Sequence, residues 1–375
     1  MAAQAPLPYA YNIVTCICID TAQADDGTVY PLLGNLSAEE RRLQYWKLAW
    51  VLMITSKLCQ PEQRHMVYTN DTGAVIADGQ DLKALLASHG IEVVVLPFAD
   101  FLAPKGTLAR FANAFYKLEV FKALAALDKP SILLDNDVVW AHRNAELEQA
   151  LADGKTLFYD IYERSATPDS RQYLGVSMRD FGQYFKDLDP AYPQALPVTI
   201  GGEVAAGAPA MFGALYAYLH PTFWEMIRRI QQGPPLPGGE RSKVFINGME
   251  TLLSMGVNRL PAVGWMNPYI KRIYNIGFLK NLKPGDEQKP IWHLPSEKHR
   301  GLANLYAFIM EGDTRFWHAS PADRAKFMGD VVAVPKRRIR RETDPTWWQD
   351  QVRTLRGRAG LARNKVKEWL GIYHS

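Results

Sequence analysis

Two aspartates, two residues apart, close an apolar segment near the middle of the sequence. Asp135 and Asp137 follow the run 131–134 (SILL), which Pro130 precedes. An apolar run of this length, entered through a proline, predicts a short buried strand. Side chains at i and i+2 of an extended chain point the same way, so both carboxylates can face one space beyond the strand. Open α/β sheets bind their ligands at that end of their strands.

The chemistry open to this pair is the binding of a divalent cation. Neighbouring carboxylates repel each other unless a cation lies between them or one of them takes up a proton. Mg²⁺ and Mn²⁺ prefer such oxygen ligands, one or two carboxylates together with substrate phosphates. A D-x-D pair is also common in solvated loops, but the apolar residues on both sides (SILL before, VVW after) favour a functional site.

Alternating strands and helices precede the acidic pair. Apolar runs and apolar residues at three- and four-residue spacing predict strands at 12–20, 64–69 and 91–96 and helices at 37–58, 80–88 and 110–127. Ser37 and Glu40 fit a capping box. The order predicts an α/β fold with a mostly parallel sheet and helices on both faces. No G-x-G-x-x-G follows the first strand and no G-x-x-x-x-G-K-[ST] occurs, which disfavours a Rossmann dehydrogenase or a P-loop ATPase.

The second half of the chain is less regular. We expect a strand at 156–161, an insertion at 163–199 that shapes a substrate cleft, a helix at 221–231 and a strand at 291–295. The small residues of 199–207 (TIGGEVAAG) let a ligand or another backbone approach closely.

Composition indicates a globular protein of 375 residues, 47% of them hydrophobic. No apolar run of about eighteen residues occurs, so no transmembrane span is expected. Residues 1–11 lack the basic and apolar regions of a secretory signal. Three cysteines give no disulfide framework and are expected to be small buried hydrophobes. We therefore expect a cytoplasmic location.

The C-terminal segment is strongly basic. Residues 336–375 carry eleven Lys or Arg and four Asp or Glu, and tryptophans lie among them. Helices expected within 347–370 would suit an anionic membrane surface, which would make the protein peripheral on the inner face of the membrane. The alternative is a helix packed on the domain with a solvated basic face. No RNA or DNA module accompanies the segment, so no nucleic acid is expected as a partner.

Five segments, taken in order, make the chain resemble the GT-A-fold, DXD-containing, metal-dependent nucleotide-sugar glycosyltransferases: NIVTCICID, VYTND, FYKLEVFKAL, LLDNDVVW and HLPSEK. The resemblance implies a glycosyltransferase domain at 1–305, with a nucleotide-binding half (10–140) and an acceptor-binding half (141–305), and a basic helical extension at 306–375. It implies a hexosyltransferase-like enzyme of polysaccharide biosynthesis, with Mn²⁺ or Mg²⁺, a UDP-sugar donor and a glycan or lipid-linked acceptor.

The resemblance also assigns the cation and phosphate sites. Asp137 and His293 would bind the metal directly, Asp135 would bind both the metal and the ribose or sugar, and Lys298 would face the departing phosphates. Residue chemistry agrees, since an imidazole beside carboxylates favours Mn²⁺ and a lysine supplies a point charge for phosphate. His293 could instead be a core histidine, and Lys298 an ordinary surface charge.

Three further residues would face the donor. Lys117 would lie near the diphosphate or sugar, and Thr15 and Asp71 near the nucleoside. Lys117 could also be a plain exposed helix position, and Asp71 a turn residue of Asn-Asp-Thr-Gly.

Two glutamates are candidates for the base that an inverting enzyme needs to take the acceptor's proton. Glu250 is predicted at a helix start after a strand, and we favour inversion with Glu250 as base. It could also be an acid favoured there by the helix macrodipole. Glu203, in GGEVAAG, is the rival and could instead bind sugar hydroxyls. The Gly201-Gly202-Glu203 stretch departs from the Asn-Ser-Gly turn of many relatives, so their acceptor contacts do not carry over.

Two other functions fit parts of the pattern. A HAD-type phosphotransferase also has D-x-D after an apolar strand, but near the chain start, whereas several elements precede it here. A non-catalytic protein that binds sugar nucleotides could share the whole fold.

Overall fold

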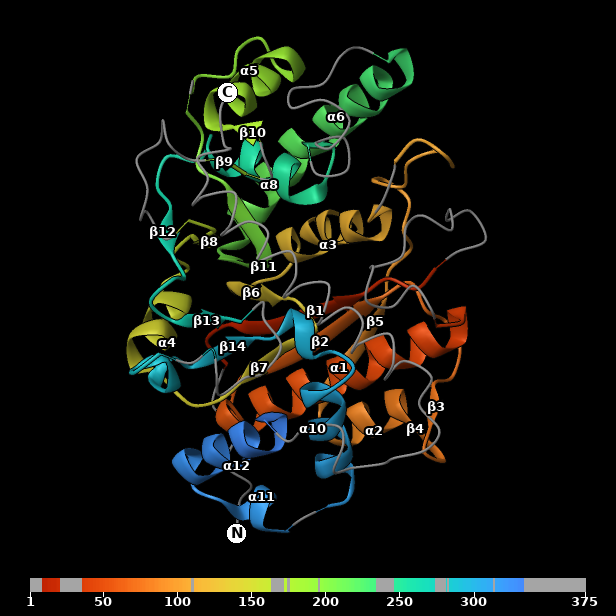
Figure 1. Cartoon of the computed structure of the whole chain (residues 1–375), viewed down its shortest axis with the longest axis vertical. Helices are drawn as coiled ribbons and strands as arrows, with labels where there is room; N and C mark the ends of the chain where they lie inside the picture. Colours follow the sequence, from red (N-terminus) through yellow and green to blue (C-terminus); the bar gives the residue numbers. More distant parts are fainter. Residues whose placement is uncertain are drawn as a thin grey trace, which may run out of the picture. The chain divides into compact units, whose positions relative to one another are not determined.

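The structure is a computed structural model that describes residues 9–20, 36–108, 111–162, 172–173, 176–194, 196–233, 246–273, 281, 283–312 and 314–333. Within residues 1–333, a central sheet lies between two groups of helices (Figure 1). The basic segment 336–375 lies outside the described residues, so the helices predicted there remain a prediction.

The central sheet has seven strands and is mostly parallel. Their spatial order is β12 (Gly264–Trp265), β8 (Leu157–Asp160), β11 (Ile200–Gly207), β6 (Ser131–Leu134), β1 (Asn12–Ile17), β2 (Arg64–Thr69) and β5 (Ile91–Val95). Strand β11 runs antiparallel to both β6 and β8, whereas the other neighbours pair in parallel. This architecture confirms the predicted α/β class.

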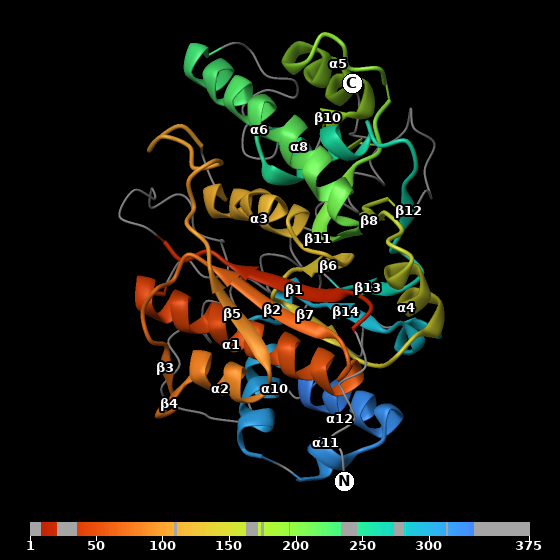
Figure 2. The ribbon, with the colours of Figure 1, turned by 180° about the vertical axis from the view of Figure 1, so that it is seen from behind.

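Helices cover both faces of the sheet (Figure 2). On one side of the sheet, one hydrophobic core includes residues of α1 (Ala38–Cys59), α2 (Leu82–Ser88), α4 (Ala145–Ala152), α10 (Gly301–Met310), α11 (Thr314–His318) and α12 (Pro321–Ala333), of which α1 and α2 contact the strands directly. The other face packs against α3 (Tyr116–Ala125), α5 (Met178–Leu188), α6 (Pro209–Gln232) and α8 (Met249–Val257). Side chains alternate along a strand, so Ile13 of β1 joins the first core and Val14 the second. Two covered faces explain why strands β1, β6, β8 and β11 are almost wholly buried.

A second, three-stranded sheet combines two strands from late in the chain with the strand that follows the acidic pair. Its order is β13 (Ile270–Arg272), β14 (Ile291–His293) and β7 (Val138–Trp140), with β14 parallel to β13 and antiparallel to β7. Two further antiparallel pairs are β3 (Ile76–Ala77) with β4 (Gln80–Asp81) and β9 (Gln172–Tyr173) with β10 (Val176–Ser177). The described residues also form the 3₁₀ helices η2 (Ala112–Phe115), η5 (Asp286–Gln288) and η6 (Pro295–Glu297).

Several of the described elements differ from their prediction. The helix expected over 110–127 starts as the η2 turn, because Phe111 has a left-handed backbone with φ 59°. The helix expected from Pro221 begins at Pro209, where a missing N–H costs nothing, and continues through Pro221. The small-residue stretch 199–207 forms the buried strand β11. None of the described helices is long and apolar enough to cross a membrane.

Candidate metal and phosphate site

The acidic pair lies where the two sheets meet. Residues 135–137 connect β6 of the central sheet to β7 of the small sheet. Because β7 pairs antiparallel with β14, Val138 is the register partner of His293, and the N–H of Leu294 donates to the carbonyl of Asp137 at 3.0 Å. This pairing brings the imidazole of His293 beside the carboxylates, as the sequence resemblance implied.

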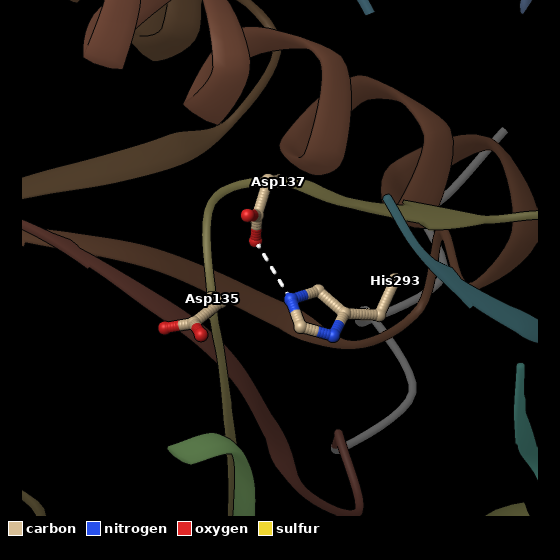
Figure 3. A group of neighbouring side chains, drawn as sticks. All are labelled: Asp135, Asp137 and His293. Atoms are coloured by element: carbon tan, nitrogen blue, oxygen red, sulfur yellow. Dashed lines mark ion pairs between the residues drawn. The ribbon is translucent and has the colours of Figure 1, made fainter. Parts of the chain in front are cut away.

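Asp135, Asp137 and His293 form a compact group (Figure 3). One potential ligand atom from each lies within 4.8 Å of the others. Nε2 of His293 is 3.2 Å from Oδ1 of Asp137, and both side chains are buried. The side chain of Asp135 is 37% exposed, which makes it the most exposed of the three.

Two lysines each contact one of the acids. Nζ of Lys298 lies 2.8 Å from Oδ2 of Asp137. Nζ of Lys117 contacts Oδ1 of Asp135 and also donates to the carbonyl of Gly202. Both lysines are almost completely buried, which removes the interpretation of either as an ordinary surface charge.

The charges of the group are strongly coupled. Burial raises the pKa of Asp137, but the positive charges of Lys298 and His293 outweigh it and hold this pKa far below its usual range. Burial lowers the pKa of His293, yet the charge of Asp137 more than compensates and leaves it raised. For Lys117, burial opposes the charged form and the adjacent Asp135 carboxylate reverses the effect, so its pKa is also raised. Asp137 is therefore ionised across the neutral range.

These donors fit a divalent cation. Two carboxylates and an imidazole are the ligand types that suit Mn²⁺ and Mg²⁺, with the imidazole favouring Mn²⁺. Oδ1 of Asp137 is buried and receives no well-aligned hydrogen bond from the described residues. A cation bound by Oδ1 of Asp137 would satisfy this oxygen.

The two candidate bases differ in their surroundings. Oε1 of Glu250, at the start of α8, accepts the N–H of Gly202 at 3.0 Å, and the side chain is 31% exposed. Glu203, on β11, has no exposed side-chain surface, and its Oε1 lies 3.1 Å from Nε of Arg272. Burial raises the pKa of Glu203 despite the opposing charge of Arg272.

Arg272 was not predicted from the sequence. It stands on the three-residue strand β13, whose sequence IKR has too little periodicity to indicate a buried charge. Only the pairing of β13 with β14 places it beside His293.

Thr15 and Asp71 are held within the protein framework. The hydroxyl of Thr15 donates to the carbonyl of Leu134 at 2.8 Å between β1 and β6. Asp71 accepts from Arg42 at 2.7 Å and from the indole of Trp46 at 2.8 Å. Their predicted place near a nucleoside remains a prediction.

Neither a protein-family model nor a curated protein matches the sequence. Among solved structures, an active-site mutant of LgtC is similar at 15% identity and a TM-score of 0.44, covering 87% of this chain and 98% of that chain. Mouse xyloside xylosyltransferase 1 in its apo form is similar at 12% and 0.40, covering 77% and 98%. The galactosyltransferase LgtC with donor and acceptor sugar analogs is similar at 13% and 0.39, covering 87% and 98%. We therefore infer function from the site itself.

Proposed function

We propose that this chain is a glycosyltransferase that moves a sugar from a nucleoside diphosphate, taken to be UDP, to a glycan or glycolipid acceptor with Mn²⁺ or Mg²⁺. One observation carries the proposal: Asp135, Asp137 and His293 converge within 4.8 Å, with Lys117 and Lys298 against the two acids. Hard oxygen ligands, an imidazole and two buried ammonium groups together suit a cation and a diphosphate.

Asp137, His293 and Asp135 would hold the cation, which when bound neutralises negative charge on the leaving diphosphate. Lys298 adds a fixed positive charge next to Asp137, in a buried position where water screens it little. Lys117 holds Asp135 in place and ties it to β11 through the carbonyl of Gly202. These contacts place both ammonium groups at the site before any substrate arrives.

The transfer breaks the bond between the anomeric carbon and the phosphate oxygen and forms a bond from that carbon to the acceptor oxygen. The acceptor hydroxyl loses its proton to a base. We assign this role to Glu250, because its carboxylate is partly exposed and is fixed by the N–H of Gly202. The assignment implies inversion at the anomeric carbon. Complete burial of Glu203 argues against direct contact with an acceptor.

The wider assignments belong to the same proposal. The acceptor would be lipid-linked and the enzyme would serve polysaccharide biosynthesis in the cytoplasm. The basic extension would begin at residue 306, and its part 336–375 would contact an anionic membrane. The excess of Lys and Arg over residues 336–375 supports the membrane contact. Binding to anionic vesicles, compared for the full chain and a variant with neutral residues at 336–341, tests it.

The decisive experiment is a thermal-shift series with nucleoside diphosphates, with and without Mn²⁺. A ligand at a hundred times its Kd stabilises the folded state by about 2.7 kcal/mol. We expect stabilisation by UDP only with the metal, and its loss in Asp137→Ala. Asp153→Ala, an exposed aspartate after α4, is the matched control. If no nucleotide stabilises the protein, the proposal fails. Stabilisation without sugar transfer or UDP-sugar hydrolysis would favour the non-catalytic alternative.

A further inference from the structure

Glu203 and Arg272 form a buried ion pair next to His293. Both side chains are nearly or fully buried, with Nε of Arg272 3.1 Å from Oε1 of Glu203. The guanidinium group also packs over the ring of Tyr159 at 5.5 Å. A buried ion pair adds little net stability compared with apolar residues of similar volume. Its presence here therefore calls for a role other than stabilising the fold.

The imidazole of His293 lies between two carboxylates. Its Nε2 is 3.2 Å from Oδ1 of Asp137, and its Nδ1 is 3.7 Å from Oε1 of Glu203. The second distance is that of an ion pair rather than of a hydrogen bond. Histidines that bind metals through one ring nitrogen usually have a carboxylate or carbonyl at the other, which fixes the ring orientation and the tautomer.

The backbone holds this arrangement in register. Arg272 and His293 are pairing partners on the adjacent parallel strands β13 and β14. The carbonyl of Glu203 accepts the N–H of Asp135 at 3.0 Å. Glu203 is thus linked to one acid of the site through its backbone and faces the histidine through its side chain.

The sequence before Glu203 makes room for its carboxylate. A Cβ atom at Gly201 would lie 2.1 Å from Oε2 of Glu203, closer than any real contact. Only glycine at position 201 allows the side chain of Glu203 to fold back in its present direction. Gly201 therefore leaves the space that this carboxylate occupies.

We propose that Glu203, itself fixed by Arg272, is a positioning residue that orients the imidazole of His293 so that Nε2 faces the Asp135–Asp137 pair. The inference rests on the cation site of the proposed function. It assigns Glu203 to the metal ligand His293 and not to the metal itself. Glu203 does not touch the acceptor in this assignment, and its effect is exerted through His293.

The test is Mn²⁺ affinity, measured by the loss of the free-Mn²⁺ EPR signal without any substrate. In Glu203→Gln we expect Mn²⁺ to bind roughly 10- to 100-fold more weakly, the usual effect of removing such a partner. The thermal midpoint without metal should fall, because the change leaves the buried charge of Arg272 without its carboxylate partner, so Mn²⁺ affinity is measured well below that midpoint. The matched control is Asp160→Asn, a buried carboxylate at the end of the neighbouring strand β8, whose Oδ1 accepts the N–H of Tyr162 instead. It should bind Mn²⁺ normally.

The possible results separate the two proposals. Normal Mn²⁺ binding in Glu203→Gln, with loss of binding in His293→Ala, would overturn the positioning role and leave the cation site intact. Normal binding in both His293→Ala and Asp137→Asn would instead overturn the proposed function. If Glu203→Gln does not fold, the paired change Glu203→Met with Arg272→Met removes both charges and keeps side-chain volume, which buried ion pairs tolerate. That variant should show the same weakening, and full affinity in it would refute the inference.

Discussion

Nζ of Lys298 lies 2.8 Å from Oδ2 of Asp137, so one acid of the candidate metal site already has a cationic partner from the protein. Lys117 does the same for Asp135. An incoming divalent cation must share these acids with the lysines, and an incoming diphosphate would give the lysines a new anionic partner. Binding of the cation and of the diphosphate should therefore be mutually reinforcing.

The first prediction concerns the coupling between cation binding and diphosphate binding. We expect UDP to tighten Mn²⁺ binding, and Mn²⁺ to tighten UDP binding by the same factor, roughly 5- to 150-fold as is typical of coupled sites. In Lys298→Met this coupling should fall, because the ammonium group that would leave Asp137 for the diphosphate is removed. Isothermal titration of each ligand with and without the other measures it. Lys122→Met, a lysine 62% exposed on α3, should keep the coupling. Equal Mn²⁺ affinity with and without UDP in the unaltered protein would refute the prediction.

The second prediction concerns stability. Lys117→Met keeps most of the buried side-chain volume but leaves the carbonyl of Gly202 and Oδ1 of Asp135 without this donor. An unsatisfied buried polar group costs about 1–3 kcal/mol, so the free energy of unfolding should fall by that amount. Urea denaturation measures the change. The exposed Lys122→Met on the same helix should stay within about 0.5 kcal/mol of the unaltered protein. Equal effects of the two variants would contradict the role of Lys117.

Local sequence patterns were sufficient to predict many elements. Strand β2 has the predicted bounds, and the predicted capping box of α1 is present in both directions: the N–H of Ser37 donates to Oε2 of Glu40 at 2.7 Å, and the N–H of Glu40 to Oγ of Ser37 at 3.2 Å. The pairing of Asp135 with Asp137 is equally local, since it depends on one strand end. Such features depend on interactions between residues that are close together in the sequence.

Two features that depend on distant pairing were not predicted from the sequence. Strand β11 is central to the sheet, yet its sequence IGGEVAAG is poor in the β-branched and aromatic residues typical of strands. It is a strand because β6 and β8 flank it on both sides. Arg272 likewise reaches the site only through the register of β13 with β14. The sequence of neither segment indicates with which strand it pairs.

The third prediction tests the space beside Glu203. In Gly201→Ala the new Cβ would lie 2.1 Å from Oε2 of a fully buried side chain, so Glu203 must move. Overpacking of this kind costs about 1–3 kcal/mol of unfolding free energy. The control is Gly213→Ala within α6, where the nearest atom to the new Cβ is 3.5 Å away. Because alanine favours a helix, that variant should gain about 0.5–1 kcal/mol. Denaturation curves of both variants decide the matter, and an unchanged Gly201→Ala would show that Glu203 has room to move.

The fourth prediction is a pH dependence that originates away from the site. His65 on β2 is fully buried, and its Nδ1 lies 2.9 Å from the carbonyl of Gln63. Burial, helped by the charge of Lys57, lowers the pKa of His65 from 6.5 to about 4. Between these values the unfolded chain binds the proton and the folded chain does not. The contribution of neutral His65 is therefore complete above pH 6.5 and is lost as the pH falls toward 4, by about 3 kcal/mol in all.

Replacement of His65 isolates this contribution from those of other groups. In His65→Gln, the loss of unfolding free energy between pH 7 and pH 4.5 should be about 2–3 kcal/mol smaller than in the unaltered protein, since no proton is taken up at this position. Urea denaturation at the two pH values measures the difference. His318→Gln, which changes an exposed histidine on α11, should leave the pH-dependent loss as it is in the unaltered protein. If His65→Gln and the unaltered protein lose the same stability, protonation of His65 does not oppose folding.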